Sequence, residues 1–158
     1  MARTIYEGFS YYSGPRLTKV KVRARDGKTW KKGCPMVIDS GLWEPIATDG
    51  TRVGAIASQD QTSATSSSDV YVERILSSET KFLGYASSDA NDAAVTRASI
   101  GEDYGIQMDT YYPSVNTNET SNVAVIVDNP LWVKEPYMND STDSPAKVIF
   151  HFEQSALE

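Results

Sequence analysis

Few side chains in this chain are of a type that performs nucleophilic chemistry. The single histidine, His151, lies between two phenylalanines, and the single cysteine, Cys34, lies between a glycine and a proline. A serine or cysteine nucleophile generally needs a base, and one histidine would have to supply it. A lone thiol supports neither a zinc site nor a redox pair. We therefore expect no catalytic residues, no cofactor and no enzymatic activity, with His151 in a structural role.

Oxygen ligands for a cation are more plentiful. Residues 89–92 and 139–143 are rich in Asp and Asn, but neither stretch has the ligand spacing of an EF-hand. Asx-rich turns explain such clusters without a metal, because these side chains hydrogen-bond their own backbone. A glycosidase-type carboxylate pair stays open from sequence alone. No metal site is predicted.

The charge is divided unevenly along the chain. Residues 1–34 hold nine basic and two acidic side chains, a charge of +7, whereas the remainder holds six basic and nineteen acidic ones, a charge of −13. This division suggests that the basic segment contacts an acidic surface. A solvated strand face is the alternative. Nucleic acid is a weaker interpretation, since the acidic remainder would repel phosphates.

The elements that must position these side chains are predicted to be strands. Residues 19–25 alternate charged and apolar side chains, which is the period of a half-buried strand. Further strands are predicted over residues 70–72, 81–85, 105–108, 123–127 and 147–152, the last with Val148, Phe150 and Phe152 on one face. We expect an all-β fold, a small β-barrel or β-sandwich with an extended N-terminal arm, and at most one short helix over residues 89–98.

Two Asp-Gly pairs predict hairpins. Asp26-Gly27 follows the strand at residues 19–25, and a return strand is expected from residue 28. Asp49-Gly50 separates residues 45–48 from a return strand at residues 53–57.

The first residues carry aromatic side chains without a core pattern of their own. We divide the chain into an extended N-terminal arm, residues 1–18, and a β domain, residues 19–158. Aromatic residues on an unpatterned terminus often dock onto a partner, so the predicted protein-interface residues are Tyr6, Phe9, Tyr11, Tyr12 and Arg16. The chain's own body is the alternative docking partner.

Composition restricts the setting of the chain. No apolar run approaches the roughly 20 residues that span a bilayer, and the N-terminus has no signal-peptide h-region. One cysteine allows no intrachain disulfide, which fits a reducing compartment. We expect no membrane and no nucleic-acid partner.

Several segments resemble known proteins. Residues 27–39, 43–50 and 53–57, followed by residues 105–110, 115–128 and 146–157, are similar to the head-decoration, or cement, proteins of tailed bacteriophages. The resemblance covers about residues 27–157 and carries over no functional residue. It implies a homotrimeric virion structural protein that assembles in the host cytoplasm. On the capsid exterior it would bind the major capsid protein and stabilise capsomer contacts.

Two other functions are alternatives to capsid decoration. A carbohydrate- or receptor-binding β module of a phage fibre or tail would use exposed tyrosines with Trp30, Trp43 and Trp132 to stack on sugar rings. An enzyme of phage lysis is disfavoured, because His151 has no catalytic partner in the sequence.

Overall fold

The computed structural model describes residues 7–47, 50–89, 91–95, 97–118, 125–131 and 146–158. Within them the chain is all-β, as predicted, with no helix of seven or more residues. The elements are β1 (Ser10–Ser13), β2 (Thr18–Val22), β3 (Pro35–Asp39), β4 (Leu42–Pro45), β5 (Ala55–Ala57), β6 (Val70–Arg74), β7 (Lys81–Ser88), β8 (Asn91–Asp92), η1 (Arg97–Ser99), β9 (Asp103–Asp109), β10 (Tyr112–Asn116), β11 (Val125–Leu131), β12 (Lys147–Phe152) and η2 (Gln154–Ala156). None of the described helices could span a bilayer.

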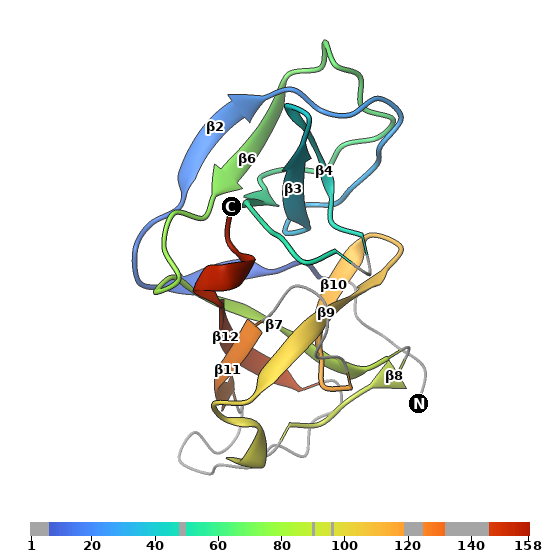
Figure 1. Cartoon of the computed structure of the whole chain (residues 1–158). Coiled ribbons are helices and arrows are strands. Elements are labelled where there is room, and N and C mark those ends of the chain that lie inside the picture. Colours follow the sequence, from blue (N-terminus) through green and yellow to red (C-terminus); the bar gives the residue numbers. More distant parts are fainter. Residues whose placement is uncertain (1–6, 48–49, 90, 96, 119–124, 132–145) are drawn as a thin grey trace.

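Five strands close into a mixed β-barrel. The order is β7-β10-β9-β11-β12, and β12 pairs back onto β7. Only the β10–β7 pairing in this ring is parallel. β1 and the two-residue β8 pair with β7 outside the ring. This barrel forms the lower part of the molecule in Figure 1.

The other five strands form an antiparallel sheet, called here the N-terminal sheet. Its order is β2-β6-β5-β3-β4, and it forms the upper part of Figure 1. Its two edges meet at one parallel bridge between Ala24 and Trp43. The Trp43 N–H donates to the Arg23 carbonyl and the Arg25 N–H donates to the Trp43 carbonyl, each at 2.9 Å.

The molecule has two apolar cores, and the first, called here the barrel core, also includes Ile56 of β5. The barrel core includes Phe82, Phe150 and Phe152, with Val148 on the same face of β12, so the predicted face of that strand is confirmed. Trp30 and Met36 are fully buried in the second core, on the inner side of the N-terminal sheet. Large buried side chains of this kind contribute most of the hydrophobic stabilisation.

The C-terminal residues join the two sheets. Val53 and Leu157 form a parallel bridge beyond the named strands. The Val53 N–H donates to the Ala156 carbonyl at 2.9 Å, and the Glu158 N–H donates to the Val53 carbonyl at 3.1 Å. Figure 1 shows the C-terminal end lying against the N-terminal sheet after leaving the barrel through η2.

The helix predicted over residues 89–98 is wrong. The described part of this range contains β8 and the start of η1. Asp92 is buried and pairs with Ser87 across the β7–β8 ladder. A helix of two or three turns is marginal by itself, so pairing with a barrel strand outweighs its local propensity.

Both predicted hairpins are wrong in their pairing. β2 pairs with β6, and Trp30 forms a bridge with Gln61 rather than with β2. β4 and β5 do not pair with each other, because each lies on one side of β3. Residues 48 and 49 lie outside the described range. The true hairpin in this region joins β3 to β4, where Ser40 and Gly41 both have positive φ.

Besides β8, the strands β1 and β10 were not predicted. β10 contains Pro113, and proline normally argues against an interior strand. The strand tolerates it because β10 pairs with β7 only at Val115 and Asn116, beyond the proline. β1 was assigned to the arm because it is short and lacks alternation.

Candidate interaction site

The predicted interface residue Phe9 lies in the core of this chain. Its side chain is 3% exposed, and its ring packs edge-on against Phe150 with centroids 4.7 Å apart. A Cβ at Gly84 would lie 2.6 Å from Phe9 Cδ1, so only glycine leaves room for the ring. The alternative from the sequence, docking onto the chain's own body, therefore describes Phe9.

Backbone contacts fix the same segment to the N-terminal sheet. The Phe9 N–H donates to the Gly33 carbonyl at 2.9 Å. A Cβ at Gly8 would lie 2.3 Å from the Lys32 carbonyl oxygen, and Gly33 has a φ of +85°. Two glycines thus allow the two backbones to approach each other closely. The arm is held between the barrel and the N-terminal sheet.

The other arm residues lie nearer the surface. Tyr12 is 47% exposed. The Arg16 guanidinium lies 5.2 Å above the ring of the half-buried Tyr11, a cation–π contact. Tyr6 lies outside the described residues. Tyr11, Tyr12 and Arg16, called here the arm patch, therefore lie at or near the surface.

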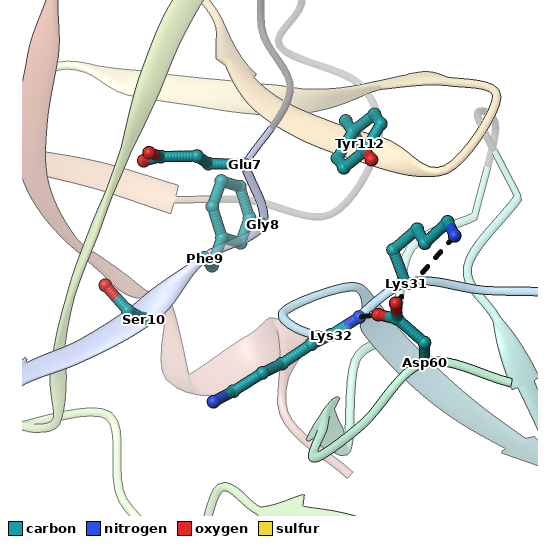
Figure 2. A pocket seen from close by; sticks show the side chains of 8 residues that line it. All are labelled: Glu7, Gly8, Phe9, Ser10, Lys31, Lys32, Asp60 and Tyr112. Atoms are coloured by element: carbon teal, nitrogen blue, oxygen red, sulfur yellow. Dashed lines mark hydrogen bonds and ion pairs between the residues drawn. The ribbon is translucent and has the colours of Figure 1, made fainter.

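A pocket of about 380 Å³ opens beside the arm (Figure 2). β1 pairs with β7 at Ser10–Leu83, and β10 joins β7 only from Val115–Ala86. The pocket lies where the start of the arm faces residues 31–32 and 60 and the first residue of β10. Its lining residues are Glu7, Gly8, Phe9, Ser10, Lys31, Lys32, Asp60 and Tyr112.

Both signs of charge line this pocket. The Lys31 ammonium lies 3.8 Å from Asp60 Oδ2, and Asp60 Oδ1 accepts the Lys32 backbone N–H at 2.7 Å. Figure 2 shows the Lys32 side chain extending away from this ion pair. The lining residues contain no histidine and no thiol. Its charged side chains of both signs favour a polar ligand.

Much of the basic segment is paired within the chain. Lys21 forms an ion pair with Asp69 at 2.7 Å. The Arg25 guanidinium binds Asp39 at 2.9 Å and also pairs with Glu44. Exposed pairs of this kind contribute about 1 kcal/mol or less each. The acidic partner expected from the charge division thus lies partly in the chain itself.

His151 belongs to a polar cluster on the outer side of the barrel. Its Nδ1 lies 2.9 Å from Asp128 Oδ2, and the Lys81 ammonium lies 2.7 Å from Asp128 Oδ1. The β11–β12 register shifts between Val127 and Asn129, so Asp128 is the extra residue of a bulge. Bulges redirect side chains, and here the carboxylate contacts two neighbouring strands.

Cys34 and Glu153 both have raised pKa values. Burial raises the pKa of the Cys34 thiol to about 12. The pKa of Glu153 is raised, first by burial and then by the hydrogen bond and charge repulsion from Asp103. A thiol in this state is almost wholly protonated at neutral pH and is a poor nucleophile.

The residues named for sugar and metal binding have structural contacts. Trp30 and Trp43 are 0% and 3% exposed, so their rings are not available to a sugar, and Trp132 lies outside the described range. Asp89 accepts hydrogen bonds from the side-chain amides of Asn116 and Asn118. The described residues contain no metal-binding group of three or more His, Cys, Asp or Glu. Residues 139–143 also lie outside the described range.

Sequence reasoning missed the residues that seat the arm. Gly8, Gly33 and Gly84 matter because each would clash if it carried a Cβ, and nothing in the sequence pairs them. Lys32 and Tyr112 line the pocket beside the arm and come from distant positions in the sequence. The one available signal was Gly8 directly before an aromatic residue.

Comparison with protein-family models, with curated proteins and with solved structures finds no match to this chain.

Proposed function

We propose that this chain is a virion structural protein that decorates the outer surface of a phage capsid and stabilises contacts between capsomers. The arm patch carries the proposal. Tyrosine and arginine are among the side chains enriched at protein interfaces, and Tyr12, in β1, and Arg16, shortly after it, are both exposed. The resemblance to cement proteins supplies the class of partner.

The state of the nucleophile candidates supports a binding role. Cys34 is fully buried and protonated, and His151 is engaged by Asp128. A decoration protein needs no catalytic group, since many weak contacts repeated over a lattice add up through multivalency. A homotrimer bound to the major capsid protein is part of this proposal.

The carbohydrate-binding alternative is weaker. Two of its three tryptophans are buried, which leaves Tyr12 as the most exposed large aromatic side chain among the described residues. Sugar-binding sites commonly depend on accessible aromatic faces, and one tyrosine offers little area for stacking.

The test is co-sedimentation of the purified chain with capsids of the virus that encodes it, assembled without this protein. We expect saturable binding and a higher temperature of capsid disruption. Tyr12→Ala should reduce affinity by about thirtyfold, the scale of an interface hot spot of about 2 kcal/mol. Arg16→Ala should reduce it less at high salt than at low salt, because exposed charges are screened.

Ile100→Ala is the matched control, since Ile100 is 39% exposed and lies outside the arm. It should bind like the unmodified chain. Failure of the unmodified chain to bind capsids at low and high salt would contradict the proposal. Binding on a glycan array would favour the alternative.

A further inference from the structure

Strand β2 has a free edge. In the N-terminal sheet it pairs with β6 alone, and Figure 1 shows it at the margin of that sheet. The other side of the chain meets β4 only beyond the end of β2, at the parallel bridge between Ala24 and Trp43. Two residues back along each chain from this bridge are Val22 and Gly41, and Gly41 lies in the β3–β4 turn. The hairpin therefore ends beside the last residue of β2, and among the described residues no strand pairs with the rest of this edge.

The backbone groups on this free edge are those of Lys19 and Lys21. The Arg23 carbonyl accepts the Trp43 N–H on the β4 side. Alternate residues of an extended strand turn their N–H and C=O groups to the same side, so those of Lys21 and Lys19 point the same way as those of Arg23. The pairing with β6 agrees, because the Tyr71 carbonyl, opposite Lys21, is turned toward β5, where it accepts a backbone N–H at 3.3 Å. The edge therefore offers donors and acceptors to an added strand.

Basic side chains line the outer face of the sheet along this edge. Lys19, Lys21 and Arg23 alternate with Val20 and Val22, whose side chains pack against the second core. The three basic side chains, called here the basic row, are exposed, and neighbours in the row are about 7 Å apart along the strand. A strand added to the edge would place its own alternate side chains directly beside them.

We propose that β2 binds an extended acidic segment of a partner protein by strand addition. The backbone of the segment pairs with Lys19 and Lys21, and its alternate Asp or Glu side chains lie beside the basic row. In this mode of recognition, main-chain hydrogen bonds supply affinity and alternate side chains supply specificity. Lysine on an edge strand disfavours pairing with other strands, and here it selects the charge of the one that pairs. The site is separate from the arm patch and does not depend on the capsid proposal.

The neighbouring strand β6 competes for part of this charge. The Lys21 ammonium pairs with Asp69 at 2.7 Å, and Glu73 lies opposite Lys19 in the β2–β6 register. The side chains of Lys21 and Asp69 are 58% and 72% exposed, so water screens their ion pair and a partner carboxylate can replace Asp69. Arg23 forms no ion pair within the described part of the chain.

Titration of the full chain with a synthetic peptide tests strand addition. The peptide has about ten residues that alternate glutamate with threonine or valine, enough to extend along the whole of β2. We expect saturable binding. The amide N–H groups of Lys19 and Lys21 should become protected from hydrogen exchange, followed by NMR. Those of Val20 and Val22 should change little, because they already face β6.

Two altered peptides separate strand pairing from charge attraction. A peptide of the same sequence with methylated backbone nitrogens keeps its charge but loses its donors, and it should bind roughly tenfold more weakly. A peptide with lysine in place of glutamate should not bind, because like charges would lie beside each other. Both comparisons use the unmodified protein, so they do not depend on the folding of a variant.

Substitutions in the sheet test the basic row. The double variant Lys19→Gln with Lys21→Gln should weaken binding of the acidic peptide by about fivefold at low salt, because two cross-strand charge pairs are lost. Asp69→Asn should strengthen it by about twofold, because it releases the Lys21 ammonium. Lys28→Gln is the matched control, since Lys28 is exposed and basic but lies beyond the free edge. It should bind the peptide like the unmodified chain.

Equal affinity for the methylated peptide, or for a single-stranded oligonucleotide of the same charge, would mean attraction to charge alone and would overturn strand addition. Absence of binding to the acidic peptide at low salt would also overturn it. The lysines of β2 would then only prevent pairing at the edge.

Discussion

Glu153 and Asp103 hold two carboxyl groups in hydrogen-bond contact, beside His151 on the outer side of the barrel. Burial and then the hydrogen bond and charge of Asp103 disfavour the ionised form of Glu153, so Glu153 holds its proton more readily in the folded chain. Because the folded pKa of Glu153 is raised above its ordinary value of 4.5, the folded chain binds more protons than the unfolded chain in this range. The stability from this group is present below that value and is lost as pH rises through the raised pKa.

Glu153→Gln should remove this pH dependence. We expect the variant to have a higher melting temperature than the unmodified chain at pH 7. The difference in melting temperature should shrink as pH falls toward the ordinary Glu pKa. Thermal unfolding followed by circular dichroism across the weakly acidic range measures it. Glu102→Gln, an exposed neighbour of Asp103, is the matched control and should leave the profile unchanged. A difference in melting temperature that is the same at every pH would contradict the raised pKa of Glu153 as its cause.

Cys34 gives a second prediction at this scale. With its pKa raised to about 12 and its side chain fully buried, the thiol should not react with iodoacetamide in the folded chain at pH 8. Labelling should become fast in urea, once burial is lost. Mass spectrometry of labelled chain against time measures both rates. Rapid labelling without denaturant would show that the N-terminal sheet opens locally.

Among the elements, η2 and the residues after it connect the two sheets. Leu157 is 8% exposed and bridges to Val53, while the Arg52 guanidinium donates to the Leu157 carbonyl at 3.3 Å. The Leu157 side chain packs in the apolar cluster that contains both Phe152 of the barrel and Ile56 of the N-terminal sheet. The C-terminal residues therefore couple the stability of one sheet to that of the other.

Leu157→Ala should lower the free energy of unfolding by about 2 kcal/mol, toward the low end for a buried leucine because the site can relax at the surface. Leu76→Ala is the matched control. Leu76 is 66% exposed, and its truncation should change stability by no more than about 0.5 kcal/mol. Urea unfolding of both variants gives the comparison. Equal losses would mean that the C-terminal residues do not join the sheets.

At the scale of the whole molecule, the sequence predicts where the strands are better than it predicts which strands pair. The structure retains the predicted alternation in residues 19–25 and the predicted apolar face of β12. Both depend on the local period of apolar side chains and on their burial. Asp26-Gly27 forms a turn but no hairpin, since the partner of β2 is β6, about fifty residues away. Long-range pairing of this kind depends on the complete set of strands, which no short window of sequence contains.

The candidate site follows the same rule. The aromatic residues of the arm are visible in the sequence, and Tyr12 and Arg16 are exposed as expected of interface residues. The burial of Phe9 was not visible, because it depends on a glycine seventy-five positions away in β7. The +7 charge of residues 1–34 likewise indicated an external partner, whereas Asp69, Asp39 and Glu44 pair with part of it.

The order of strands along the chain also determines when each sheet can form during synthesis. All five strands of the N-terminal sheet lie between residues 18 and 74, so a ribosome delivers them before any barrel strand. The barrel closes only when β12, at residues 147–152, reaches β7. Until then β7 has an unpaired edge and its apolar face lacks Phe150 and Phe152, a state that attracts other nascent chains. A translational pause after β7 has left the ribosome would lengthen this exposure, whereas a pause after β6 has emerged and before β7 emerges would give the N-terminal sheet time to fold alone.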